Sequence, residues 1–371
     1  MILLVRSNGI YSDSRVEKYI SFYREQEIPY TILGWDRSNN SPSSDSIIFF
    51  KRTASFASGG VRAMWNRIFW FVFVIKFLVK NGKSYEVIHA CDLDCSFPVS
   101  LYKALWNKKA FYIFDVFDWF SALSNNKLAV FFAKFMERFS TRYANEIIIC
   151  ESERRIQIPY KLKKEPLVLP NIPCFNNISF LESRDEYKFN NEKLTVSYVG
   201  WFGYARFLEE LLDVAEEGVI NLLIAGYGNS KIENRCTLLS KSNINVRYYG
   251  KVSYSTGLNI MYNSDIIYAM YCKQVSNHVY AAPNKYYEAM MLGVPILSTK
   301  GIIIGDKIEK LDIGYTIHET VDSLKECLTH IDIAEAKRKG KCAKEVWHRS
   351  YENFTIDFFN NEYLPLITKR K

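Results

Sequence analysis

Three ionisable side chains in the second half of the sequence have the types and spacing needed to hold a phosphorylated ligand. Lys285 and Glu288 lie three residues apart in a segment that begins at Pro283, which suits a first helical turn, so both would share one helix face. Arg206 follows a glycine-containing turn and precedes another helix pattern. A guanidinium can grip phosphate through two hydrogen bonds, a lysine adds charge, and a carboxylate can accept ribose hydroxyls. The alternatives are a plain turn with a surface arginine and a surface Lys285–Glu288 ion pair.

Glycines end three predicted strands near these residues, which would let a ligand approach the backbone. Gly203 precedes the arginine, Gly226 and Gly228 close the next strand, and Val252 follows Gly250. A glycine turn that leads into a helix also offers free N–H groups to an anion. We therefore expect Gly203, Gly226, Gly228 and Val252 to line the same site.

The elements that must position these residues are short buried strands that alternate with amphipathic helices, a pattern typical of doubly wound parallel sheets. The pattern occurs twice, separated by irregular stretches at 170–173 and 183–193. We predict an α/β chain of two Rossmann-like domains facing across a cleft, with a ligand at the carboxyl ends of the strands. The expected strands are 2–5, 30–34, 87–90, 111–114, 147–150 and 167–169, then 195–199, 221–225, 246–249, 266–270 and 294–298.

The predicted domains are 1–172 on the acceptor side and 173–349 on the donor side. A C-terminal helix over 350–371 is expected to pack back on the first domain, by analogy with chains of this architecture. The N-terminal apolar run is expected to be the first strand and not a signal peptide.

Composition narrows the function classes. The 371 residues include 48 Lys and Arg against 40 Asp and Glu, a net charge of +8 that favours anionic partners but is too scattered to predict nucleic-acid binding. The 8 cysteines form no zinc-binding spacing and suit a reducing compartment, so the expected location is the cytoplasm.

Residues 61–80 form the most apolar segment, but Arg62, Arg67, Lys76 and Lys80 interrupt it too often for a membrane span. A basic helix with Trp and Phe on its other face can lie in the plane of an anionic membrane surface, which predicts peripheral contact with the inner face of the cell membrane. The alternative is a core helix whose Lys and Arg reach solvent.

Several motifs, in this order, resemble those of the retaining, nucleotide-sugar-dependent glycosyltransferases of family four, which have the two-domain GT-B fold. The resemblance covers nearly the whole chain, and its specificity lies in the order and spacing of the motifs. They occupy 13–16, 85–94, 114–118, 144–148, 150–153, 169–171 and 283–295, the last being similar to the "PNK-x-x-E-x-M-x-x-G-x-P" block of bacterial surface-polysaccharide members.

The resemblance implies transfer of a sugar from a UDP- or GDP-linked donor to a polysaccharide or oligosaccharide, lipid-linked in the leading hypothesis. The implied reaction retains anomeric configuration and needs no metal or other cofactor. Arg206 and Lys285 would bind the donor diphosphate, Glu288 the ribose, and Asn284 and Tyr280 would lie against the donor.

In the first domain, the resemblance implies that Asn8 and Gly9 form the loop that faces the sugar. Asp92 would belong to a strand-end loop, and Asp118 would be a catalytic residue on the acceptor side, near the reacting carbon. Asp92 and Asp94 also mimic the metal-binding D-x-D of one-sheet glycosyltransferases, an interpretation that we set aside because two sheets are expected here.

The sequence departs from the family pattern at four positions. Tyr280 stands in place of a glutamate, Cys91 and Phe117 in place of histidines, and Trp201 in place of a polar residue. Phe117 and Tyr280 motivate a second hypothesis, a non-catalytic relative that binds nucleotide or glycan as a scaffold. A dinucleotide-dependent oxidoreductase is a third, although 226–231 lacks the third glycine of G-x-G-x-x-G.

Overall fold

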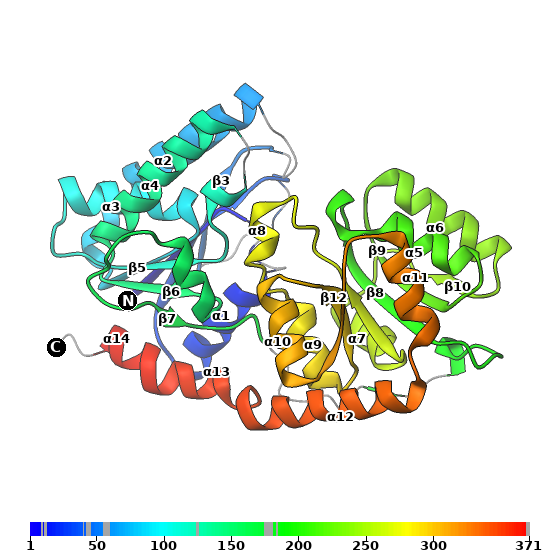
Figure 1. The fold of residues 1–371 in the computed structure, drawn as a ribbon. Coiled ribbons are helices and arrows are strands. Elements are labelled where there is room, and N and C mark those ends of the chain that lie inside the picture. The colour runs from blue at the N-terminus through cyan, green and yellow to red at the C-terminus, as the bar shows by residue number, and fades with distance from the viewer. Residues whose placement is uncertain are drawn as a thin grey trace. The chain divides into compact units, whose positions relative to one another are not determined.

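The computed structural model describes residues 1–371 except positions 9, 11–12, 40, 42–45, 55–59, 124–125, 174–180, 183–184 and 369–371. The chain divides into two compact units: Met1–Pro170 together with Ile356–Lys371, and Asn171–Thr355. The boundaries predicted from the sequence are 172/173 and 349/350. Each unit contains one parallel sheet with helices on its faces, so the predicted α/β class with two doubly wound sheets is confirmed (Figure 1).

The first unit contains a seven-stranded sheet with the order β3-β2-β1-β4-β5-β6-β7. The order reverses between β1 and β4, and the carboxyl ends of strands at such a point are where open α/β sheets bind ligands. The edge strand β3 was missed by the sequence analysis. The strands are β1 (Ile2–Arg6), β2 (Tyr30–Asp36), β3 (Ile47–Lys51), β4 (Val87–Cys91), β5 (Phe111–Val116), β6 (Glu146–Ile149) and β7 (Leu167–Val168).

Both faces of this sheet are covered, as the continuous apolar strands require. Leu3 and Val5 pack into a core closed by three helices that lie side by side in Figure 1: α2 (Gly60–Asn81), α3 (Leu93–Leu105) and α4 (Lys127–Tyr143). Leu4 points to the opposite face, where it packs with Val16 and Ile20 of α1 (Ser14–Glu25). The short turns of the unit are η2 (Gly82–Ser84), η3 (Phe120–Ala122) and η4 (Ser152–Gln157).

The segment expected as one C-terminal helix is broken into three pieces: α13 (Phe354–Asp357), the π-helical turn η7 (Phe358–Tyr363) and α14 (Leu364–Thr368). The N–H of Leu364 donates to the carbonyl of Phe359, five residues earlier, directly before Pro365, which has no N–H to donate. Within the first unit, the Tyr363 hydroxyl lies 2.8 Å from Nδ1 of His89.

The second unit contains a six-stranded sheet with the order β10-β9-β8-β11-β12-β13, which reverses between β8 and β11. The strands are β8 (Thr195–Phe202), β9 (Asn221–Gly228), β10 (Val246–Tyr248), β11 (Ile266–Ala269), β12 (Ile296–Thr299) and β13 (Gly314–Ile317); the sequence analysis missed β13. The helices are α5 (Leu208–Glu216), α6 (Ser230–Ser242), α7 (Tyr254–Tyr262), α8 (Ser276–Val279), α9 (Asn284–Leu292), α10 (Ile303–Leu311), α11 (Val321–His330) and α12 (Ile333–Ser350), with short turns η5 (Asp185–Tyr187) and η6 (Tyr204–Arg206).

Alternating residues of β9 show that this sheet is also buried on both faces. Leu222 and Ile224 enter one core cluster, whereas Leu223 and Ala225 enter another. No helix within the described ranges is long and apolar enough to cross a membrane.

Candidate functional site

Arg206 lies at the point where the second sheet reverses. It ends the turn η6, which follows β8, and its guanidinium carbon lies 4.2 Å from the centroid of the Tyr271 ring, which follows β11. The Nη1 atom of Arg206 is buried without a hydrogen-bond partner among the described residues. The arginine is therefore held by an aromatic face, and part of its hydrogen-bonding capacity is unused.

Lys285 extends from the first turn of α9 toward the end of β8. Its ammonium lies 5.0 Å from the centroid of the Tyr198 ring, and a Cβ added to Gly200 would lie 2.7 Å from its Nζ. Burial lowers the pKa of Lys285 to about 8; the nearby Glu288 opposes this shift and Arg206 adds to it. A lysine with this pKa keeps its charge at neutral pH at an energetic cost that an anionic ligand would relieve.

Two facing glycines, Gly200 and Gly226, form the part of the backbone that Lys285 approaches. Gly200 of β8 and Gly226 of β9 are partners in the parallel register, with φ of 150° and 148°. A Cβ on Gly226 would lie 1.8 Å from the carbonyl oxygen of Gly200. The strand ends therefore need glycine at both positions.

Glu288 is buried one turn beyond Lys285 and accepts a hydrogen bond of 2.7 Å from the Tyr254 hydroxyl of α7. Burial raises the pKa of Glu288, against the lowering effects of Lys285 and of this hydrogen bond. Within the described contacts, Glu288 forms no ion pair with Lys285, so the surface-pair interpretation is wrong.

Within the described residues, neither Arg206 nor Lys285 has a carboxylate in ion-pair contact, although Glu288 lies close enough to stabilise the charge of Lys285. Arg206 is close enough to Lys285 for its charge to lower the pKa of the lysine. Each is placed over a tyrosine ring instead of a carboxylate. Two neighbouring, partly desolvated cations without direct ion pairs are suited to bind a polyanion such as a diphosphate.

Two of the glycines predicted to line the site, Gly203 and Gly228, lie next to the side chain of Trp201. A Cβ on Gly203 would lie 2.2 Å from the ring of Trp201, and one on Gly228 would lie 2.7 Å from its Nε1. Trp201 itself is exposed at the end of β8. Gly203 and Gly228 therefore leave room for this tryptophan.

The remaining predicted residues of the second unit occupy neighbouring turns. Val252 precedes α7, the helix that supplies Tyr254 to Glu288. Tyr280 directly follows the short helix α8, and Asn284 begins α9. Tyr198, Tyr254 and Tyr271 were missed by the sequence analysis, although the position of Tyr271 directly after a strand-like run was a usable signal.

The first unit also has polar pairs where its sheet order reverses. Arg6, the last residue of β1, forms ion pairs with Asp92 and with Asp13, the latter at 2.6 Å. The Ser7 hydroxyl donates to Asp94 at 2.5 Å. Both carboxylates of the D-x-D sequence are therefore used within the fold, one by an arginine and one by a serine.

Asp92 has φ of 65° and accepts hydrogen bonds from the N–H groups of Phe117 and Asp118, at 3.0 and 3.3 Å. Burial raises the pKa of Asp92 to about 6; Arg6 lowers it and Asp94 raises it further. Asp92 thus fixes the turn that carries the predicted acceptor-side residue.

Asp118 is half exposed and forms an ion pair of 3.1 Å with Arg154. Phe117, at the position of the expected histidine, lies under the guanidinium of Arg6 at 4.2 Å. Asn8 follows the end of β1, and Gly9 lies outside the described residues.

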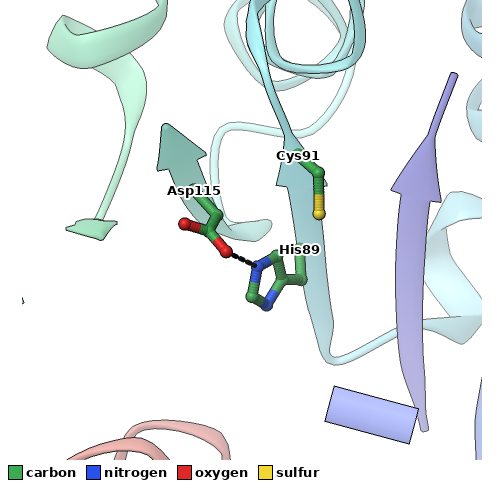
Figure 2. Close-up of side chains that lie close together, drawn as sticks. All are labelled: His89, Cys91 and Asp115. Carbon is green, nitrogen blue, oxygen red and sulfur yellow. Dashed lines mark ion pairs between the residues drawn. The ribbon is translucent and has the colours of Figure 1, made fainter. Parts of the chain in front are cut away.

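His89, Cys91 and Asp115 are the one group within the described ranges with atoms close enough to share a metal ion (Figure 2). Asp115 is already bound by Arg15, whose Nη2 lies 2.7 Å away, and by the Tyr19 hydroxyl at 2.8 Å. Burial raises the pKa of Cys91 well above its ordinary value, which keeps it a thiol rather than a ligating thiolate. The residues do not fit a metal site, because a buried arginine already supplies the positive charge.

No family model matches the sequence, and no curated protein matches it. Solved structures do match. The sucrose-phosphate synthase of Thermosynechococcus elongatus has a TM-score of 0.71 at 15% identity, over 96% of this chain and 96% of that chain. The lipopolysaccharide outer core galactosyltransferase WaaB has a TM-score of 0.59 at 12% identity, over 96% and 98%. The chain has the GT-B fold.

The GT-B fold also occurs in sugar-nucleotide epimerases. The UDP-GlcNAc 2-epimerase of Methanocaldococcus jannaschii, solved with UDP-GlcNAc and UDP, has a TM-score of 0.56 at 11% identity, over 94% of this chain and 99% of that chain. At these identities the comparisons establish the fold, and the choice of reaction depends on the residues of the site.

Proposed function

We propose that the protein is a glycosyltransferase that uses a UDP- or GDP-linked sugar as donor. The observation that carries this proposal is the pair of neighbouring cations, Arg206 and Lys285, at the β8–β11 reversal of a GT-B sheet, each over a tyrosine ring and without a direct ion pair in the described part of the chain. Glu288, buried beside them and oriented by Tyr254, supplies a carboxylate for the ribose hydroxyls. The neighbouring solved glycosyltransferases support the same reaction class.

In the proposed reaction, the bond between the anomeric carbon and the β-phosphate oxygen breaks, and a bond to an acceptor hydroxyl oxygen forms with retention. The nucleoside diphosphate leaves with the bonding electrons, and the acceptor proton is released. Arg206 and Lys285 would stabilise the charge that develops on the leaving oxygen. Because two protein cations are available for that task, we propose a metal-independent reaction.

For the acceptor we propose a glycan, lipid-linked, of a surface polysaccharide such as a capsule or lipopolysaccharide, with the reaction in the cytoplasm. Asp118 would be the acceptor-side residue, because it is half exposed at the end of β5 and its turn is fixed by Asp92 and Arg154. Asp118→Asn should then lower kcat with donor affinity retained.

The binding half of the proposal is tested by thermal unfolding with UDP, GDP, CMP, ADP and dTDP, each with and without EDTA. A ligand at about a hundred times its Kd stabilises the folded state by ~2.7 kcal/mol. We expect UDP or GDP to stabilise wild type and not Arg206→Gln. Arg247→Gln is the matched control, since Arg247 also lies over an aromatic ring, Phe189 at 4.3 Å, in the same unit.

The reaction is tested by following donor and product by NMR in the presence of glycan acceptors. Release of nucleoside diphosphate with a new glycosidic signal supports transfer. Conversion of the donor into its epimer without acceptor would instead assign an epimerase, and nucleotide binding without turnover would favour the scaffold hypothesis.

A further inference from the structure

The helices α2 and α4 of the first unit expose large apolar side chains to solvent. Phe131, Phe132 and Phe135 of α4 are each more than half exposed, at 66%, 59% and 58%. On α2, the exposed apolar residues include Trp65, Phe69 and Val72, whereas Trp70, Val74 and Leu78 on its other side are buried in the core. We call the six exposed residues, with the basic side chains around them, the α2/α4 surface.

The charge of this surface is of one sign. Helix α2 contains four basic residues and no acidic residue, and α4 contains four basic residues and one acidic residue. The two helices together therefore have a net charge of +7, compared with +8 for the whole chain. The one acid, Glu137, is buried and accepts a hydrogen bond of 2.8 Å from the N–H of Ser121, so it does not oppose the positive charge outside.

Two sets of contacts place α2 and α4 on the same side of the sheet. Phe97 of α3 lies between them, with ring centroids 5.8 Å from Phe71 of α2 and 5.9 Å from Phe139 of α4. The turn η3 also contacts both helices. Arg67 of α2 lies 5.5 Å from the centroid of the Phe120 ring, and the N–H of the next residue, Ser121, donates to Glu137 of α4. Figure 1 shows the three helices side by side.

We propose that the α2/α4 surface docks the protein on an anionic lipid bilayer. Aromatic side chains are stable at the boundary between headgroups and acyl chains, and lysine and arginine bind the lipid phosphates around them. A surface with basic residues and no exposed acid matches a uniformly negative partner, whereas protein interfaces are depleted in lysine. The sequence alone predicts membrane contact only for 61–80. The structure adds α4, whose phenylalanines are more exposed than the apolar residues of α2.

The test uses the full chain and sedimentation with vesicles of phosphatidylcholine alone or mixed with phosphatidylglycerol. We expect binding to the mixed vesicles, weakened by salt, and little binding to phosphatidylcholine. Lys127→Gln with Lys134→Gln should weaken it about thirtyfold. Lys337→Gln with Lys341→Gln, in exposed positions of α12, should have a smaller effect.

The aromatic contribution is tested by Phe131→Ser with Phe135→Ser, which should abolish sedimentation and leave thermal stabilisation by nucleotide unchanged. Leu238→Ser with Ile244→Ser is the matched control, because these residues of the second unit are 67% and 84% exposed. The proposal is overturned if the protein stays in the supernatant with anionic vesicles at low salt. It is equally overturned if the phenylalanine pair instead dissociates a dimer in size-exclusion chromatography. Nucleotide binding is measured separately, so either result leaves the proposed reaction independently testable.

Discussion

The guanidinium of Arg206 lies against the face of the Tyr271 ring, at 4.2 Å, and the two residues follow the two strands between which the second sheet reverses. An arginine positioned by a carboxylate would have its charge neutralised. An aromatic ring positions it without neutralising it, so the charge and the buried Nη1 remain available to a ligand.

This relationship predicts a role for Tyr271 in nucleotide affinity. Tyr271→Leu should weaken UDP or GDP binding by about two- to thirtyfold, because a cation–π contact contributes ~0.5–2 kcal/mol. Tyr271→Phe retains the ring and should bind as wild type does. Calorimetric titration of both variants checks the prediction, and equal affinities for the leucine and phenylalanine variants would contradict it.

The lowered pKa of Lys285 predicts that nucleotide affinity depends on pH. The ammonium is charged below about pH 8, and an anionic ligand favours that form. Between about pH 8 and 9.5, affinity for UDP or GDP should fall by up to about tenfold per pH unit, whereas Lys285→Gln should bind weakly at every pH. Titrations above about pH 7 avoid the second ionisation of the terminal phosphate, at about pH 6. A flat wild-type profile would show that Lys285 does not contact the ligand.

Burial of the charged Lys285 should also lower the free energy of unfolding at neutral pH. Its pKa is lower in the folded protein than the ordinary value of 10.5, so the unfolded chain binds more protons between about pH 8 and 10.5, and stability rises with pH in that window. Below about pH 8 the destabilisation is complete. Lys285→Met should therefore stabilise the ligand-free protein by on the order of 2 kcal/mol at pH 7, and by much less at pH 10. Denaturant unfolding at both pH values checks this, with the exposed Lys337→Met as the control.

The fold could be predicted from the sequence largely because parallel strands buried on both faces are continuous apolar runs. The strands around Leu3, Ile88 and Leu223 were found on that signal. The edge strands β3 and β13 were missed for different reasons. The sequence of β13, Gly-Tyr-Thr-Ile, carries little of the apolar pattern, whereas β3, Ile-Ile-Phe-Phe-Lys, has an apolar run that could have been recognised.

The candidate site was predictable only in part. Arg206, Lys285 and Glu288 stand next to recognisable turns and helix starts, and the structure brings them close enough to affect the pKa of Lys285. Their positioning partners are three tyrosines from β8, α7 and the end of β11, whose roles depend on contacts between elements far apart in sequence. In a chain with 25 tyrosines, composition cannot select these three.

The facing glycines of β8 and β9 predict a strong effect on stability. Gly226→Ala would place its Cβ 1.8 Å from the Gly200 carbonyl oxygen, so the two paired strands must separate at the site. We expect a loss of more than about 3 kcal/mol in the free energy of unfolding. Gly250→Ala is the control: its φ is 66° and nothing lies within 4 Å of the added Cβ, so only backbone strain of about 1 kcal/mol applies. Equal losses for the two variants would contradict the close approach of β8 and β9.

The buried carboxylate of Glu288 predicts selectivity for ribose over deoxyribose. Wild type should bind UDP about ten- to a hundredfold more tightly than dUDP, because a hydrogen bond to a charged group contributes ~1.5–3 kcal/mol. Glu288→Gln keeps an oxygen that can accept from Tyr254, now 2.7 Å from the carboxylate, but loses the charge, so the preference for ribose should shrink several-fold. Tyr254→Phe should reduce the preference less, because the carboxylate remains while its orientation is lost. If GDP is the preferred ligand, the comparison uses GDP and dGDP. A ribose preference that is the same in wild type and Glu288→Gln would exclude Glu288 from ribose binding and leave it as a buried partner of Tyr254.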